Sequence, residues 1–122
     1  VEFDTRSIKG GELFIALPGE QTHGHAFLER AFEAGAALAL VEDEKLLDGP
    51  FGERLIYCKN TLEGFWDTAR LHRRHLTGKV LGVTGSMGKT TTKEIAATLL
   101  QSIAPGTYSK KSFNNHLGVP YT

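Results

Sequence analysis

The sequence predicts an α/β protein with mainly parallel strand pairing. Short apolar runs typical of buried strands alternate with segments whose apolar residues recur at helical spacing. A glycine-rich turn, GVTGSMGKTTTKE at residues 82–94, joins the last such run to the last helical segment. With 122 residues, 40% of them hydrophobic, the chain can form one ordinary domain, or a small domain and part of another.

Three apolar runs in the first half of the chain are expected to be strands. They are ELFIAL (12–17), closed by Pro18-Gly19, then AALALV (36–41) and RLIYC (54–58). Between the first two, residues 25–35 have helical spacing and reach Gly35, a residue type that commonly ends helices. We expect a surface loop at 48–52 and a buried thiol at Cys58 in the third strand.

A second helix is expected to begin after Asn60, which can cap it, with Glu63 three residues later completing a capping box. Its apolar face is formed by Leu62, Phe65, Trp66 and Ala69, while Arg70, Arg73, Arg74, His72 and His75 belong to its solvent side. Thr77-Gly78 ends this helix.

The last third begins with KVLGVT (79–84), which we expect to be a strand feeding the glycine turn. A helix follows at 89–102, and its inward-facing residues are predicted to be Ile95, Ala96, Leu99 and Leu100. We therefore divide the chain into a small α/β unit at 1–77 and the beginning of a second, parallel-sheet domain at 78–122.

Composition excludes several classes of function. Lys+Arg and Asp+Glu are 14 each, so no net charge favours nucleic acid or a membrane surface as partner. One cysteine, no signal peptide and no long apolar run indicate a cytoplasmic protein, which we expect to be a monomer. The chain opens on Val1 and stops at GVPYT, so we expect a portion of a longer polypeptide that is inactive alone.

The glycine turn has the features of a phosphate cradle. Gly85 and Gly88 bracket Ser86 and Met87, and Lys89, Thr90 and Thr91 begin the predicted helix. Glycines allow close backbone approach, helix N-terminal amides face the anion, and a lysine and a hydroxyl can serve terminal phosphates and Mg²⁺. The usual P-loop has its first glycine where this chain has Val83. The alternative to a phosphate cradle is a glycine-rich strand-to-helix turn that binds no ligand.

The shifted glycine gives a Thr-Gly-Ser-x-Gly-Lys-Thr-Thr pattern that resembles the ATP loop of the Mur ligase family. Residues 4–27, DTRSIKGGELFIALPGEQTHGHAF, resemble the N-terminal domain of the members that act on UDP-muramoyl peptides. AFEAGAALALV (31–41) is similar to their following helix and strand. FNNHLGVPYT (113–122) resembles a segment of the member that adds D-alanyl-D-alanine.

This resemblance implies an ATP-dependent amide ligase of peptidoglycan precursor synthesis. It assigns residues 1–77 to a UDP-muramoyl-peptide-binding substrate domain and residues 78–122 to the beginning of a P-loop ATP-binding domain. Its substrates would be UDP-N-acetylmuramoyl-tripeptide and D-alanyl-D-alanine, joined through an acyl phosphate, with ATP and Mg²⁺ as cofactors. Residues 85–91 would hold the ATP phosphates, Lys89 would neutralise their charge as the catalytic residue, and Thr90 would reach the metal. The residues implied at the muramoyl-peptide substrate are Thr5, Glu20, Gln21, Thr22, Asn114, Asn115 and His116.

Each implied substrate residue has a structural alternative. Asp4 and Arg6 can form an ion pair that only tethers the N-terminal segment, and Thr22 can simply begin the helix that follows. His23 and His25 form a His-x-His pair without a further pair at metal-ligand spacing, which favours surface histidines over a zinc site. Asn114 and Asn115 can be plain turn residues.

Other functions are compatible with the same residues. A sister ligase that adds the third peptide residue shares the first domain. A non-catalytic module for nucleotides or UDP-sugars would bind without turnover. A folylpolyglutamate synthetase, also of this family, is disfavoured because it has no counterpart of DTR...ELFIALPGE.

Overall fold

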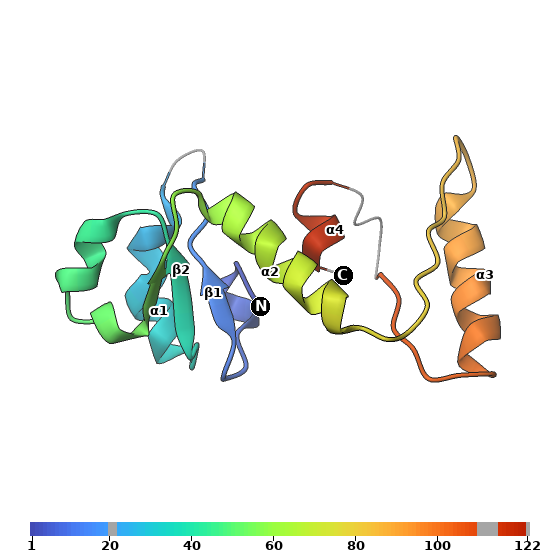
Figure 1. Cartoon of the computed structure of the whole chain (residues 1–122), viewed down its shortest axis with the longest axis horizontal. Coiled ribbons are helices and arrows are strands. Elements are labelled where there is room, and N and C mark those ends of the chain that lie inside the picture. Colours follow the sequence, from blue (N-terminus) through green and yellow to red (C-terminus); the bar gives the residue numbers. More distant parts are fainter. Residues whose placement is uncertain (20–21, 110–114, 122) are drawn as a thin grey trace. The chain divides into compact units, whose positions relative to one another are not determined.

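The computed structural model describes residues 1–19, 22–109 and 115–121 (Figure 1). The chain divides into two compact units, Val1–Arg70 and Leu71–Thr122. This division falls inside helix α2 (Thr61–His75), a few residues before the boundary expected after residue 77. The substrate-binding and ATP-binding assignments of the two parts remain predictions.

The first unit is built on a parallel sheet with the order β1-β2-β3, so the expected pairing is confirmed. The strands are β1 (Leu13–Ile15), β2 (Leu38–Val41) and β3 (Leu55–Tyr57). Leu13 is in register with Leu38, and Ala39 with Leu55. Because all three strands run the same way, their carboxyl ends lie at one edge of the sheet.

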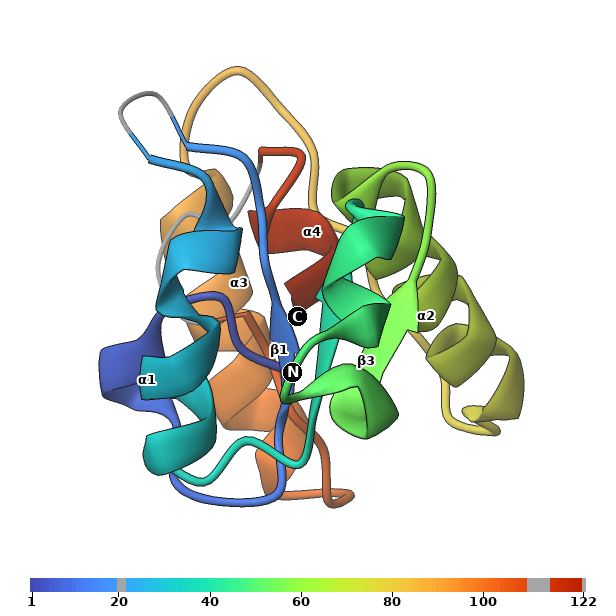
Figure 2. The same cartoon turned by 90° about the vertical axis from the view of Figure 1, so that its left-hand side faces the viewer.

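Both faces of the sheet are covered by helices, as both views show (Figures 1 and 2). On one face, α1 (Leu28–Glu33) contributes to a buried apolar cluster with side chains of β1 and β2. The members of this cluster are Phe14, Ala16, Leu28, Ala31, Phe32, Ala36, Ala39 and Val41. A 3₁₀ turn, η2 (Gly24–Phe27), precedes α1, so the helix predicted at 25–35 is present as two helical segments.

Gly35 ends α1 as the sequence predicted. It has a φ of 102°, which favours glycine, and its N–H donates to Phe32 O while the N–H of Ala36 donates to Ala31 O. These two hydrogen bonds form a Schellman motif, which satisfies the last carbonyls of the helix. The chain is thereby turned directly into β2.

The opposite face of the sheet is covered by the first part of α2, where Phe65 is 1% exposed. Gly64 permits this close approach, because a Cβ there would lie 2.7 Å from Leu40 Cδ2 and 3.1 Å from Cys58 Sγ. Asn60 caps α2, since its Oδ1 accepts the Glu63 N–H at 2.9 Å, as expected. Cys58 is half-buried just beyond β3 and donates to Val41 O, so the prediction of a buried strand thiol was wrong.

The segment between β2 and β3 contains two 3₁₀ turns, η3 (Glu44–Asp48) and η4 (Gly52–Arg54), which overlap the two ends of the surface loop predicted at 48–52. Arg54 explains how this segment is held. Its guanidinium lies 4.0 Å from the centroid of the Phe32 ring and donates hydrogen bonds to Ala36 O and, at 3.2 Å, to Ala37 O. Phe51 packs on the same Phe32 ring, so one arginine links η4 to the end of α1.

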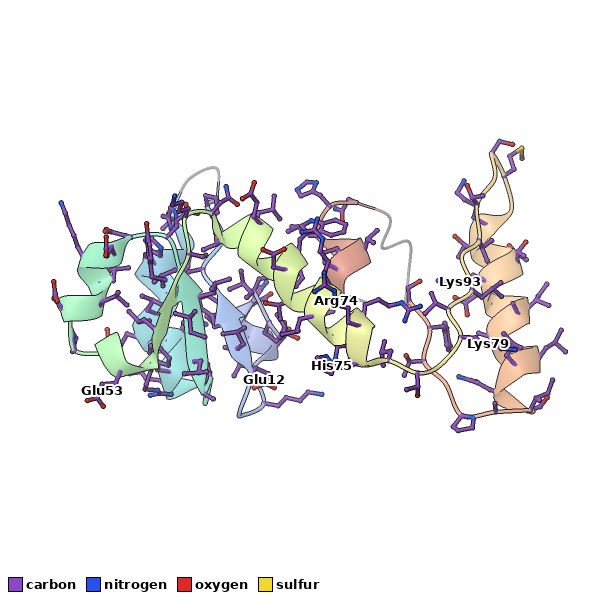
Figure 3. All side chains as sticks on the ribbon, viewed as in Figure 1. Glu12, Glu53, Arg74, His75, Lys79 and Lys93 are labelled. Carbon is purple, nitrogen blue, oxygen red and sulfur yellow. The ribbon has the colours of Figure 1, made fainter. Side chains whose placement is uncertain are left out.

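The last turn of α2 is exposed, including Arg74 and His75 (Figure 3), which agrees with the polar face predicted for it. His75 Nδ1 contacts Leu71 O at 2.8 Å. No helix in the described part of the chain has the length and apolar character needed to cross a membrane.

The second unit contains α3 (Lys89–Gln101) and the short α4 (Gly118–Tyr121). The strand predicted at 79–84 is absent: within the described residues no strand follows β3. A strand needs a hydrogen-bonded neighbour, and no described segment pairs with 79–84, so Val80 and Leu81 are 65% and 66% exposed.

The inward face predicted for α3 is also wrong. Ile95, Leu99 and Leu100 are 56%, 62% and 50% exposed, and the fourth predicted residue, Ala96, is half-buried. Ala97, which was not predicted, is 9% exposed. A helical period identifies an apolar stripe, but burial requires an element packed against it. In this unit, Lys93 Nζ donates to Ser109 O at 2.7 Å and connects α3 to the segment after it.

Candidate functional site

The glycine turn lies directly before α3, as its sequence predicts. Gly85 has a φ of 151° and Gly88, the N-cap of α3, has a φ of 73°. These backbone conformations favour glycine, and Gly88 is in the left-handed region. Ser86 and Met87, between the two glycines, are exposed, and the Met87 side chain is 90% exposed at the tip of the turn.

Lys89 is the first residue of α3, and its side chain folds back over the turn. Its Nζ donates to the carbonyl oxygen of Gly85 and, at 3.3 Å, to that of Ser86. The amine is therefore held beside the turn. A phosphate oxygen is a stronger acceptor than a neutral carbonyl, so the same amine could serve it.

A phosphate group fits this turn. A Cβ at Gly88 would meet nothing within 4 Å, and one at Gly85 would meet only Met87 O at 3.7 Å, so the backbone is open to a ligand. The first hydrogen bond of the helix runs from Thr92 N to Gly88 O, and the N–H groups of the turn before it carry the positive end of the helix dipole. Thr90 and Thr91 lie in this first helical turn and are exposed.

Asn115 and His116 precede α4, and both are exposed. Asn115 Oδ1 accepts hydrogen bonds from Leu117 N at 3.3 Å and Gly118 N at 2.7 Å. Its side chain therefore begins α4, which supports the structural alternative for this residue. Asn114 lies outside the described residues, so its predicted substrate contact stays a prediction.

Thr5 and Thr22 are the described residues predicted for the substrate end of the first unit. Thr5 is half-buried in the 3₁₀ turn η1 (Thr5–Ser7), and Thr22 is exposed beside His23. Within the described residues, no hydrogen bond joins the two threonines. Glu20 and Gln21 lie outside the described residues.

Thr22 does not begin the helical segment that follows it. The N-cap of η2 is His23, whose Nδ1 accepts the His25 N–H at 3.3 Å. The alternative in which Thr22 begins the helix was therefore wrong by one residue, because a histidine nitrogen here replaces the usual hydroxyl oxygen of a cap.

Asp4 and Arg6 form an ion pair within one turn, with Arg6 Nη2 at 2.7 Å from Asp4 Oδ2. Asp4 is also the N-cap of η1. The hydrogen bonds from the Arg6 side chain and backbone lower the pKa of Asp4 to about 2. The pair thus stabilises the local turn, as the structural alternative predicted, and it is exposed enough for solvent to weaken it.

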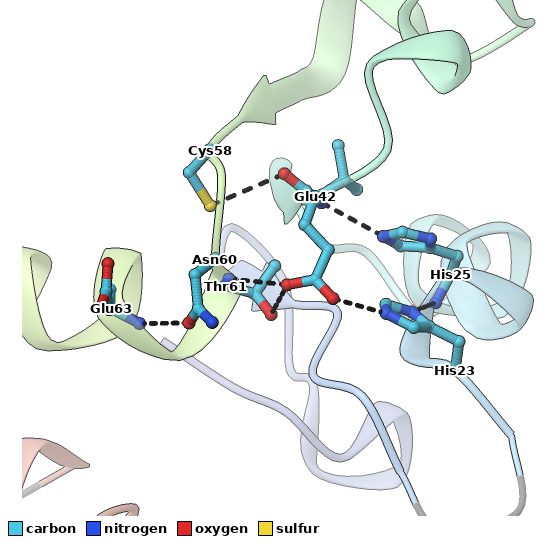
Figure 4. Close-up of polar contacts among 8 residues, drawn as sticks. His23, His25, Glu42, Cys58, Asn60, Thr61 and Glu63 are labelled. Carbon is cyan, nitrogen blue, oxygen red and sulfur yellow. Dashed lines mark hydrogen bonds and ion pairs between the residues drawn. The ribbon is translucent and has the colours of Figure 1, made fainter.

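A polar cluster at the carboxyl edge of the sheet was not predicted (Figure 4). Glu42 follows β2 directly, and its Oε1 lies 2.8 Å from His23 Nε2. Its Oε2 accepts hydrogen bonds from Thr61 N at 3.0 Å and Thr61 Oγ1 at 3.2 Å. The Thr61 N–H lowers the pKa of Glu42 most, with burial opposing it and His23 adding to it. Glu42 is thus held as a carboxylate.

His25 completes this cluster. Its Nε2 accepts the Glu42 N–H at 3.2 Å, and its ring contacts that of His23 with 3.9 Å between centroids and 36° between the ring planes. Burial and the neighbouring His23 lower the pKa of His25. The two histidines are half-buried and hydrogen-bonded, so the expectation of simple surface histidines was wrong.

No set of three His, Cys, Asp or Glu side chains in the described part of the chain could hold a metal ion.

One sequence signal could have indicated the cluster around Glu42. This acidic residue comes directly after a buried strand, and parallel sheets place functional side chains at the carboxyl edge of their strands.

Comparisons with known proteins identify the family of this chain. Residues 1–99 match the family described as "Mur ligase family, catalytic domain". The UDP-N-acetylmuramoyl-tripeptide–D-alanyl-D-alanine ligase of Bacillus subtilis (strain 168) is 39% identical over 122 residues, which cover 100% of this chain and 26% of the relative.

Two solved structures are also similar over 98% of this chain. MurF from Acinetobacter baumannii has a TM-score of 0.82 at 30% identity, with 26% of its own chain covered. The MurF ligase of Thermotoga maritima, in complex with ADP, has a TM-score of 0.79 at 28% identity, with 27% covered. The chain thus spans about a quarter of the length of the relatives it matches. Since the family match extends over residues 1–99, well beyond half of the sequence, the chain belongs to the Mur ligase family.

Proposed function

We propose that this chain is the N-terminal portion of an ATP-dependent ligase that joins D-alanyl-D-alanine to UDP-N-acetylmuramoyl-tripeptide. The observation that carries the proposal is the turn at Gly85–Gly88 with Lys89 folded over it at the start of α3. Support for the substrates comes from relatives named for this reaction, whose similarity extends over 98% to 100% of the chain.

In this proposal the backbone of the glycine turn and the amides at the start of α3 bind the phosphates of ATP. Lys89 turns its amine from the carbonyls of Gly85 and Ser86 to the phosphate oxygens and neutralises their charge. Thr90 places its hydroxyl where Mg²⁺ would accompany the phosphates. When bound, ATP supplies the phosphoryl group that makes a substrate carboxylate reactive toward an amine.

The first unit would bind the UDP-muramoyl peptide. Thr5 and Thr22 are the described residues proposed for this role, together with Glu20 and Gln21. Asn114, Asn115 and His116 are proposed near the peptide, and Asn115 would have to do so while capping α4. We further propose a cytoplasmic monomer that acts on small molecules, without a nucleic-acid partner or membrane insertion.

The test is ADP release by a purified ligase that contains this chain. With MgATP and D-alanyl-D-alanine, we expect turnover with UDP-N-acetylmuramoyl-tripeptide and little with the corresponding dipeptide. Turnover with the dipeptide substrate and a single diamino acid would instead identify the sister ligase that adds the third residue. Nucleotide binding without ADP release under any of these conditions would contradict the proposed ligase and favour a binding module.

A further inference from the structure

We propose that Glu42 is a positioning residue for the substrate end of the first unit, through its contacts with His23 and α2. This inference rests on the proposed function, in which Thr22, next to His23, contacts the UDP-muramoyl peptide. Glu42 joins segments that are 19 residues away in each direction along the chain, at His23 and Thr61.

The two carboxylate oxygens of Glu42 are divided between two elements (Figure 4). Oε1 contacts His23, at the start of η2, and Oε2 accepts from the Thr61 N–H and hydroxyl, at the start of α2. The Glu42 side chain is 23% exposed, so these charge-assisted hydrogen bonds are partly shielded from water. One side chain thus sets the distance between the segment after β1 and the helix after β3.

The hydrogen bonds assign the tautomers of both histidines. His23 Nδ1 accepts the His25 N–H, so His23 carries its proton on Nε2 and donates it to Glu42. His25 Nε2 accepts the Glu42 N–H, so neutral His25 carries its proton on Nδ1. Glu42 therefore orients both rings, one through its carboxylate and the other through its backbone.

The backbone beside His23 has little freedom to compensate if this contact is lost. His23 forms an antiparallel bridge with Pro18, and Gly24 N donates to Leu17 O at 2.9 Å. A Cβ at Gly24 would lie 2.5 Å from the backbone carbon of Ala16, so η2 starts in direct contact with the end of β1. The backbone at His23 is thus held by the end of β1, whereas the orientation of the His23 ring, beside Thr22, depends on its contact with Glu42.

Glu42→Gln tests this inference in the ligase that contains this chain. Glutamine has one acceptor oxygen, so it can serve Thr61 or the His23 Nε2–H but not both in the present arrangement. We expect the dissociation constant for UDP-N-acetylmuramoyl-tripeptide to rise about tenfold, because the peptide must then order the unanchored His23 side chain as it binds, with that for MgATP unchanged. The ¹⁵N shifts of the His23 ring should also lose the pure Nε2–H pattern.

Glu44→Gln is the matched control, because Glu44 is exposed two residues later in η3. It should leave both dissociation constants and the His23 shifts unchanged. If Glu42→Gln does not fold, His23→Ala replaces it, because that change leaves the contact between Glu42 and Thr61 in place; the same tenfold loss is expected.

The outcomes separate this inference from the proposed function. Wild-type protein that does not bind the muramoyl peptide at all would refute the substrate assignment, and the inference with it. Wild-type binding together with unchanged affinity in both Glu42→Gln and His23→Ala would overturn the positioning role alone. Equal weakening of muramoyl-peptide and MgATP binding would show a general structural role and would also overturn it.

Discussion

Lys89 Nζ donates a hydrogen bond to the carbonyl oxygen of Gly85, so the first residue of α3 closes the turn that leads into its own helix. The contact places a positive charge beside open backbone at Gly85 and Gly88. It also means that the amine has a polar partner before any phosphate arrives. Exchange of that carbonyl for an anionic oxygen is favourable, since the attraction between opposite charges is added to the hydrogen bond.

Replacement of Lys89 by alanine should abolish most activity of the ligase. An uncompensated phosphate charge would remain as the reaction proceeds, and removal of one such stabilising group typically lowers kcat by about 10²–10³-fold. ADP release in the presence of both substrates measures this. Lys45→Ala, at an exposed lysine of η3 in the other unit, is the control and should be near wild type. Near-normal ligation by Lys89→Ala would refute the assignment of the cradle.

Gly88→Ala should weaken MgATP binding without any steric clash. A Cβ at this position meets nothing within 4 Å, but the φ of 73° strains an alanine by roughly 1–2 kcal/mol. Isothermal titration should therefore show about tenfold weaker binding, because the free turn of the variant relaxes away from this conformation and must be forced back into it when the phosphates bind. Gly82→Ala is the matched control, since a Cβ there also meets nothing within 4 Å and the φ of Gly82 lies outside the range that favours glycine. Equal weakening of MgATP binding by the two changes would contradict a role for the Gly88 backbone.

Gly24→Ala should destabilise the first unit. The added Cβ would lie 2.5 Å from Ala16 C and 2.7 Å from Leu17 O, and these backbone atoms cannot move away without disturbing the end of β1. We expect a loss of about 1–3 kcal/mol in the free energy of unfolding, or more, as for other overpacked sites. Urea unfolding measures it. Gly78→Ala, where a Cβ meets nothing within 4 Å, should differ little from wild type.

Stability of the first unit should decrease as the pH falls below the ordinary histidine pKa of 6.5. Burial and the adjacent His23 lower the pKa of folded His25, with Glu42 and Asp43 opposing them, so the unfolded chain takes up the proton at higher pH than the folded one. The contribution of His25 to the free energy of unfolding is therefore complete above pH 6.5. It is lost as the pH falls through the lower pKa of His25 in the folded protein. The lowered pKa of Glu42 adds a further loss, below its ordinary 4.5.

Melting temperatures between pH 7.5 and 5.5 would measure this dependence. His25→Gln removes the titrating ring and should flatten the profile, whereas His72→Gln, at an exposed position of α2, should not. If the melting temperature of His25→Gln fell with pH as steeply as that of the wild type, a group other than His25 would be responsible for the pH dependence.

The two ligands should perturb different residues of this chain. We expect uridine diphosphate or the muramoyl peptide to shift the amide resonances of Thr5 and residues 20–22, and MgATP to shift those of residues 85–91. The reason is that one set lies in the first unit and the other begins α3 in the second. Heteronuclear NMR titration with each ligand separately tests this. Overlapping sets of shifted resonances would contradict two separate sites.

The sequence by itself determined the features whose residues are neighbours along the chain. The glycine turn needs only Gly85, Gly88 and Lys89 in order before a helix, and backbone conformation and helix start follow from those residue types. Likewise Gly35 ends α1 and Asn60 caps α2, because both act within one helical turn. The three apolar runs of the first unit became its parallel strands for a similar reason: their length and composition suit a buried sheet.

Only the tertiary structure decided which segments meet. The strand expected at 79–84 and the buried face of α3 both depend on partners that an apolar pattern does not specify, and Val80 and Leu99 are exposed here. Conversely, Glu42 lies 19 residues from both His23 and Thr61, and they meet because the parallel sheet and its connections bring the ends of β1, β2 and β3 to one edge. Local preferences act over a few residues, whereas burial and side-chain pairing depend on the path of the whole chain.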